Sequence, residues 1–223
     1  MIKVINLVKT YGQGKGATQA LKGINLEVAE GEFVAIMGRS GSGKSTLLHL
    51  LGMLDEPTSG EIWIYDCEIQ KLNPESQALF RLSQLGYVFQ EFSLISELTL
   101  LENVYLPAVS LNRTNHHRER ARSLLETMGL GQRLTHYPHE VSGGEQQRTA
   151  IARAIINQPK IIFADEPTAA VDDETASLII ALFKELKKEG KTIIVSTHDK
   201  SLIHEGTLHL IAQDGELRQV TRE

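Results

Sequence analysis

The sequence has little cysteine, few aromatic residues and no long apolar run. Its 223 residues include one cysteine, Cys67, and aromatic residues make up 5%. A single cysteine excludes an internal disulfide and fits a reducing compartment. No stretch reaches the roughly 18 consecutive apolar residues of a membrane span, and the first residues lack the apolar region of a signal peptide. We therefore expect a cytoplasmic protein that needs another subunit for any step across a membrane.

An excess of positive charge is also missing. The formal net charge is −5, with 23% charged and 41% hydrophobic residues. This balance argues against nucleic acid as the main partner, because nucleic-acid binders usually carry a strong basic bias. The composition is ordinary for a soluble globular protein, and the length suffices for one domain with a sizeable core.

The clearest motif is a glycine-rich segment that follows a continuous apolar run. The run Phe33–Met37 is typical of a buried parallel strand. It leads directly into Gly38, Arg39, Ser40, Gly41, Ser42, Gly43, Lys44, Ser45 and Thr46. These residues fill the P-loop pattern G-x-x-x-x-G-K-[ST], in which backbone N–H groups and a helix N-terminus hold phosphate oxygens. Lys44 is expected to reach the β and γ phosphates and Ser45 to bind Mg²⁺.

Polar residues end three further apolar runs, and parallel strands place such residues at one edge of a sheet. Asp165 and Glu166 follow residues 160–164, His198 follows residues 192–196, and Gln90 follows residues 85–89. Beside a P-loop, Asp165 can hold Mg²⁺ and Glu166 can activate the attacking water. A neutral His198 can reach the γ-phosphate, and Gln90 can touch the metal or the water. Taken alone, Asp165 and Glu166 also fit a helix N-cap, and His198 a surface histidine.

The remaining pattern predicts an α/β fold. Residues 2–8 and 24–28 read as strands, residues 46–54 and 174–189 as helices, and residues 207–220 as a hairpin. Residues 91–157 hold no convincing strand, and we expect them to form a helical subdomain inserted into the α/β core. A second glycine-bearing helix start, Ser142, Gly143, Gly144 and Glu145, lies inside this stretch and has no lysine of its own. It could complete the phosphate site of a second copy.

Together these motifs resemble the ATP-binding subunit of an ABC transporter over essentially the whole chain. Residues 142–146 match the signature segment of that family, residues 165–168 its second nucleotide motif, and residues 197–199 its switch-histidine segment. Asp172 matches the loop after the second motif, and Tyr11 the aromatic residue that stacks on adenine. The resemblance implies one ATPase domain over residues 1–223, with a mostly parallel RecA-like P-loop core. The core and an N-terminal antiparallel β subdomain would take up residues 1–90 and 158–223, with the helical subdomain at 91–157.

The resemblance also implies the activity and the partners. The expected activity is hydrolysis of ATP with Mg²⁺, in a head-to-tail dimer of two copies that drives a separate integral membrane permease. Residues 47–52, 55–60 and 98–104 resemble the branch with lipoprotein-releasing and macrolide-efflux cassettes, whose permeases typically have four spans per subunit. The branch implies export or extraction from the membrane, at the cytoplasmic side of the inner membrane.

Two other functions stay open from the sequence. One is a soluble cassette ATPase acting in DNA repair or translation, although the interval from Lys44 to Ser142 leaves no room for a long coiled coil and only one cassette is present. The other is a cassette that regulates a periplasmic enzyme without transport.

The chain departs from the family pattern at two places. Glu145 stands where the signature commonly has Gln, and we expect it to face the ribose rather than the phosphates. Ala169 stands where a Ser or Gly is frequent, which removes any hydroxyl contact from that position.

Overall fold

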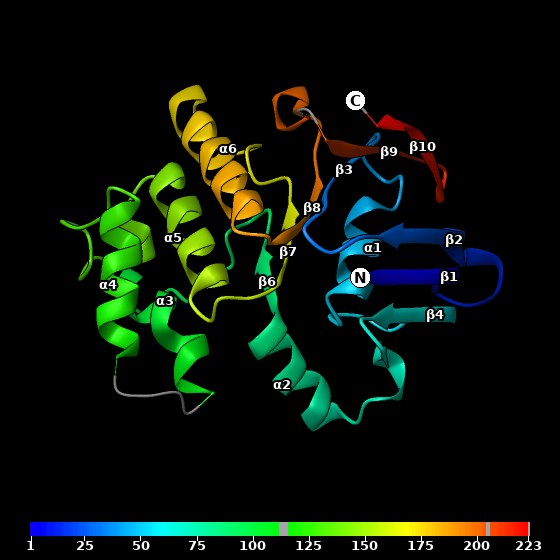
Figure 1. The fold of residues 1–223 in the computed structure, drawn as a ribbon, viewed down its shortest axis with the longest axis horizontal. Helices are drawn as coiled ribbons and strands as arrows, with labels where there is room; N and C mark the ends of the chain where they lie inside the picture. The colour runs from blue at the N-terminus through cyan, green and yellow to red at the C-terminus, as the bar shows by residue number, and fades with distance from the viewer. Residues whose placement is uncertain (112–115, 204–205, 223) are drawn as a thin grey trace.

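Two β-sheets and a group of helices on one side make up the protein (Figure 1). The computed structural model describes residues 1–111, 116–203 and 206–222. The smaller sheet is antiparallel, in the order β2-β1-β4-β5. Its strands are β1 (Ile2–Tyr11), β2 (Thr18–Val28), β4 (Ser59–Ile64) and β5 (Cys67–Glu68). Alternating apolar residues such as Leu21, Ile24 and Leu26 turn one face of it to the core. β2 begins before the expected residue 24 because Thr18 already pairs with Tyr11.

The larger sheet has six strands in the order β10-β9-β3-β8-β7-β6. Its strands are β3 (Phe33–Met37), β6 (Leu85–Val88), β7 (Ile161–Asp165), β8 (Thr192–Ser196), β9 (Thr207–Gln213) and β10 (Glu216–Arg222). All neighbours pair in parallel except β9 with β10. β3, β7 and β8 are buried almost throughout, as their continuous apolar runs predict. Asp214 and Gly215, both with positive φ, turn β9 into β10.

Helices cover both faces of this larger sheet. α1 (Lys44–Leu51) lies between the two sheets and packs Leu47, Leu48 and Leu51 into their shared core. It begins two residues before the predicted start and stops at Gly52, which caps it. α6 (Asp173–Lys188) packs Ile179 and Phe183 on the opposite face. α2 (Pro74–Gln84) precedes β6 and is not evident in the periodicity, since it buries no residue completely.

Between β6 and β7 the chain forms helices, and the described residues 91–111 and 116–157 contain no strand. The helices are α3 (Leu100–Val109), α4 (His117–Thr127) and α5 (Gly143–Ile155). They share an apolar cluster and gather at one side of the molecule, away from the antiparallel sheet (Figure 1). Short 3-10 helices complete the secondary structure: η1 (Gly14–Gly16), η2 (Ile69–Lys71), η3 (Pro138–Glu140) and η4 (Lys200–Leu202).

The sheet register decides where the polar residues gather. Ile36 of β3 and Asp165 of β7 both pair with Ser196 of β8. The three strands therefore end side by side, and the residues that follow them share one edge of the sheet, as expected for ligand sites of open α/β sheets. None of the helices in the described parts of the chain is long and apolar enough to cross a bilayer.

Candidate active site

The P-loop runs from the end of β3 into the first turn of α1. Gly43, at the N-cap of α1, has φ 98°, a value that L side chains rarely adopt. A Cβ at this position would lie 2.6 Å from the carbonyl oxygen of Ala20. Glycine is therefore needed here for both conformation and space. The Ser42 hydroxyl inside the loop is buried and has no hydrogen-bond partner within the protein, which suits an acceptor supplied by a ligand.

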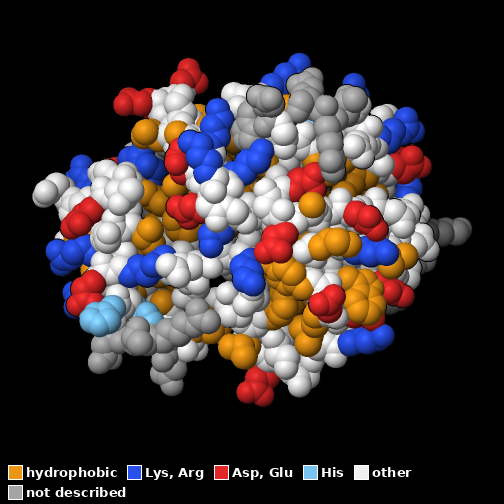
Figure 2. Space-filling model, in the orientation of Figure 1, with side chains coloured by type: hydrophobic (Ala, Val, Ile, Leu, Met, Phe, Trp, Pro, Cys, Tyr) orange, Lys and Arg blue, Asp and Glu red, His pale blue; other side chains and the backbone are white. Residues whose placement is uncertain are grey.

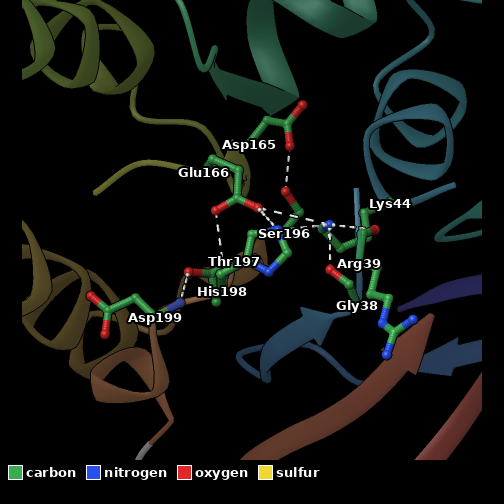
Figure 3. Close-up of polar contacts among 9 residues, drawn as sticks. All are labelled: Gly38, Arg39, Lys44, Asp165, Glu166, Ser196, Thr197, His198 and Asp199. Atoms are coloured by element: carbon green, nitrogen blue, oxygen red, sulfur yellow. Dashed lines mark hydrogen bonds and ion pairs between the residues drawn. The ribbon is translucent and has the colours of Figure 1, made fainter. Parts of the chain in front are cut away.

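The side chain of Lys44 is held in place by backbone carbonyl groups of the P-loop. Its ammonium group donates hydrogen bonds to the carbonyl oxygens of Gly38 at 2.8 Å and Arg39 at 3.3 Å. The side chain is 7% exposed, and Nζ lies 3.8 Å from Oε1 of Glu166 and 3.4 Å from Nε2 of His198. A cation from the start of α1, a carboxylate that follows β7 and an imidazole that follows β8 thus meet at one point (Figure 3).

Glu166 sits at the end of β7 in a constrained conformation. Its φ is 44°, and its backbone N–H donates to the carbonyl of Ser196 at 3.0 Å. The carboxylate faces His198: the backbone N–H of His198 donates to Oε2 at 3.2 Å, and Nε2 lies 3.1 Å from Oε1. A non-glycine residue with positive φ costs about 1–3 kcal/mol and is common at functional sites. Here the two strand ends hold the Glu166 carboxylate toward the P-loop.

Asp165, the last residue of β7, is 5% exposed and accepts a hydrogen bond from the Ser196 hydroxyl. The pKa of Tyr87 is raised, mainly by burial of its phenol and further by the nearby charge of Asp165. A buried carboxylate at a strand end, with an adjacent hydroxyl donor, is the kind of oxygen group that binds Mg²⁺.

A cleft of about 710 Å³ joins these groups. Among its lining residues are Ser40, Gly41, Ser42, Gly43, Lys44, Ser45, Thr46, Gln90, Glu166 and His198. Gly38 and Arg39 line an adjoining cavity of about 410 Å³ beside the β9–β10 turn. Predicted P-loop residues therefore come together with Gln90, Glu166 and His198 around one space, with Thr168 and Asp199 as further lining residues. The buried Asp165 is not among the lining residues. Thr168 donates its hydroxyl proton to Oδ2 of Asp199 at 3.2 Å, a contact that the sequence did not single out.

The second glycine-bearing helix start lies elsewhere. Neither residues 142–145 nor Asp172 line the P-loop cleft as the structure describes it. Asp172 caps α6 by accepting from the backbone N–H of Thr175 at 2.8 Å, and a Cβ on Gly144 would lie 3.0 Å from the Thr175 hydroxyl. The start of α5 and the start of α6 are thus neighbours, and Gly144 is buried where they meet.

Tyr11 does not line the P-loop cleft, although its phenol interacts with the side chain of the P-loop residue Thr46. Its side chain is partly exposed, and its hydroxyl donates to Oδ2 of Asp55 at 2.9 Å. Lys9 pairs with Oδ1 of Asp55 at 2.6 Å, and Nζ lies 4.8 Å from the centre of the Tyr11 ring. Burial raises the pKa of Tyr11, so the phenol stays protonated. Sequence reasoning missed Lys9 and Asp55 as supports of Tyr11, because their contact spans more than 40 residues.

The P-loop, the acids that end β7 and the parallel sheet define a P-loop nucleoside triphosphatase. Comparison with known proteins identifies the family within this class. The family model for ABC transporters matches residues 21–169. An uncharacterized ABC transporter ATP-binding protein of Methanocaldococcus jannaschii is 48% identical over 99% of both chains. The chain belongs to the ABC transporter family as an ATP-binding cassette, and it is an ABC-type ATPase.

Two further relatives bear on function. The macrolide export ATP-binding/permease protein MacB of Chlorobaculum tepidum is 42% identical over 96% of this chain, which spans 33% of that protein. A dimeric ATP-binding cassette in a post-hydrolysis state, bound to ADP and Pi, matches with a TM-score of 0.94 and 43% identity over 100% of this chain and 99% of that one.

Proposed function

We propose that this ATPase drives a separate integral membrane permease that exports its substrate or extracts it from the membrane. The observation that carries the proposal is the convergence of Lys44, Glu166 and His198 on one cleft. This arrangement brings the P-loop lysine to the residues that follow β7 and β8. Support for export comes from relatives such as the macrolide export protein, which carries a permease in the same chain.

In this proposal the residues of the cleft have separate roles. The P-loop N–H groups and Lys44 bind the phosphates of ATP, because a cation and a helix N-terminus both favour oxyanions. Oε1 of Glu166 accepts a proton from the attacking water, whose oxygen then bonds to the γ-phosphorus as ADP leaves. The imidazole of His198 contacts the γ-phosphate, and Gln90 orients the water.

The residues present also fit Mg²⁺. Ser45, Gln90 and Asp165 offer hydroxyl, amide and carboxylate oxygens, and Ser45 and Gln90 line the cleft beside Lys44. Held by these residues, Mg²⁺ would supply positive charge that neutralises the charge on the phosphate oxygens. The burial of Asp165 and its hydrogen bond with Ser196 keep its carboxylate in one orientation for this task.

A second copy would complete the site. Ser142, Gly143, Gly144 and Glu145 of one copy would cover the ATP bound to the P-loop of the other, with Asp172 at the same interface. The position of these residues outside their own P-loop cleft supports this arrangement, as do the dimeric structures of a similar cassette. Such a symmetric pair has one closed two-fold interface, which would contain two identical ATP sites. Tyr11 would stack on the adenine of its own chain's ATP.

The permease would bind the cassette at the cytoplasmic side of the inner membrane and be of the four-span type. We propose residues 1–90 and 158–223 as the nucleotide-binding core and residues 91–157 as the helical subdomain, which would pass the nucleotide state from Gln90 to the permease. The alternative, action on nucleic acid in repair or translation, is less well supported. On the face in Figure 2, Lys and Arg side chains mix with Asp and Glu instead of forming one basic field.

The test is purification of the tagged chain from membranes in mild detergent. The proposal predicts an integral membrane protein in stoichiometric amount and ATP hydrolysis by the complex. Co-purification of nucleic acid or ribosomes, with no membrane protein, would favour the alternative. A permease that stimulates hydrolysis but moves no substrate would support the regulatory cassette.

A further inference from the structure

The carboxylate of Glu145 is turned back onto its own chain. Its Oε2 accepts a hydrogen bond from the backbone N–H of Ser142 at 2.8 Å, and its own N–H donates to the Ser142 hydroxyl oxygen at 3.2 Å. These two bonds form a capping box at the start of α5. The Glu145 carboxylate therefore holds the backbone of Ser142, and the Glu145 backbone N–H holds the Ser142 hydroxyl oxygen.

The other carboxylate oxygen of Glu145 pairs with Arg133. Nε of Arg133 lies 3.2 Å from Oε1, and Nη1 lies 3.3 Å from Nε2 of His136. The loop that carries Arg133 is tied to the start of α3, since the N–H groups of Leu100 and Leu101 donate to the carbonyls of His136 and Leu134. Arg133 is thus presented to Glu145 from a fixed loop.

Glu145 carries a full negative charge at neutral pH. The hydrogen bond from Ser142 is the largest influence on its pKa and lowers it, and Arg133 lowers it further against the opposing effect of burial. Protonation cannot remove this charge, so a neighbouring cation must offset it. Without such a cation, the carboxylate would repel any triphosphate that α5 approaches.

We propose that Arg133 is a positioning residue for ATP-dependent dimerisation, acting through Glu145. It offsets the Glu145 charge and fixes the carboxylate that holds the backbone N–H of Ser142, and so the start of α5 that would face the nucleotide of the second copy. This inference rests on the proposed function, because it requires that α5 faces ATP across a dimer. It also explains how this chain can have Glu145 where the family commonly has Gln, because Arg133 pairs with the additional negative charge.

The experiment measures the ATP concentration that half-maximally dimerises the full chain, by light scattering after size exclusion, in a Glu166→Gln background that slows hydrolysis. Arg133→Gln should raise this concentration about three- to tenfold, a range suited to a partly exposed ion pair. Arg133→Lys should recover most of the loss because it keeps the charge. Glu145→Gln combined with Arg133→Gln should return to within about twofold of the background, because no charge is left to offset.

Two controls separate this role from a structural one. Arg122→Gln, an exposed arginine on α4, should leave dimerisation unchanged. Binding of a fluorescent ATP analogue to monomeric Arg133→Gln should also be unchanged, since Arg133 does not line the P-loop cleft.

Two results would overturn the inference alone: a normal dimer from Arg133→Gln, or an equal loss whether residue 145 is Glu or Gln. If the Glu166→Gln background itself stays monomeric with Mg-ATP, the ATP-bridged dimer is wrong and this inference falls with it.

Discussion

The backbone N–H of His198 donates a hydrogen bond to Oε2 of Glu166, while the imidazole Nε2 of the same histidine lies 3.1 Å from Oε1. One residue at the end of β8 therefore contacts both oxygens of the carboxylate at the end of β7. Because Lys44 also lies within 3.8 Å of Oε1, contacts within the protein itself orient the Glu166 carboxylate. Such preorganisation lowers the cost of arranging the site during reaction.

Lys44→Ala should weaken ATP binding about ten- to hundredfold, because hydrogen bonds to charged groups contribute about 1.5–3 kcal/mol. The measurement is equilibrium binding of a fluorescent ATP analogue. Lys188→Ala is the matched control, since that lysine is 72% exposed on α6 and pairs with Glu185. Equal ATP affinity of the two variants would contradict a role for Lys44 in ATP binding.

Gly43→Ala should destabilise the protein by about 1–3 kcal/mol or more, because φ 98° is strained for alanine and the new Cβ would press on the Ala20 carbonyl. Nucleotide affinity should fall as well. Gly16→Ala is the control, because nothing lies within 4 Å of a Cβ there. Denaturant unfolding of both variants checks the difference, and a neutral Gly43→Ala would contradict it.

Asn103→Ala should cost about 2–4 kcal/mol of folding free energy. The side chain is fully buried on α3, accepts from the N–H of Ile95 and donates to the carbonyls of Ile95, Leu98 and Thr99. Removing it takes the acceptor from the Ile95 N–H and one donor from each carbonyl, although the carbonyls of Ile95 and Thr99 keep a backbone donor.

A second asparagine supplies the comparison for this loss. Asn73 caps α2 at the surface through one bond to Ser76, and Asn73→Ala should cost about 1 kcal/mol. Thermal unfolding ranks the two variants, and an equal loss would show that the buried network of Asn103 adds nothing.

Arg153→Ala should loosen the segment between Gln90 and α3. The guanidinium donates to the carbonyls of Phe92 and Ser93 at 2.7 and 2.5 Å, and both residues have positive φ. Loss of these bonds should cost about 1–3 kcal/mol. Adding Ser93→Gly should recover part of it, because glycine adopts positive φ without strain. No recovery in urea unfolding would mean that backbone strain plays no part.

Local sequence patterns predicted much of the core. Continuous apolar runs located β3 and β8 to the residue, and the P-loop located the start of α1 within two residues. Parallel pairing of the strands also predicted that the residues after them share one edge of the sheet. In the structure, Glu166 and His198 do meet Lys44 at this edge. β9 was expected only as one arm of a hairpin, yet it also extends the sheet beside β3, because pairing between distant strands leaves no local mark.

Contacts between distant side chains could not be predicted from the sequence either, because they leave no local pattern. Arg153 and Ser93 are 60 positions apart, and Lys9 and Asp55 are 46 apart. Exposed arginines and lysines are common, so only the fold shows which of them have a partner. Arg133 is nearer to Glu145, but the turn that joins them has no periodic signature.

Glu166→Gln provides the most direct test of the account, measured as ATP binding and phosphate release in parallel. The amide keeps an acceptor for the His198 N–H but cannot take a proton from water, so ATP affinity should stay within about twofold while hydrolysis falls at least about a hundredfold. Glu174→Gln, on the exposed first turn of α6, should hydrolyse ATP as the unmodified protein does. Near-normal phosphate release by Glu166→Gln would contradict the assignment of the water-activating carboxylate.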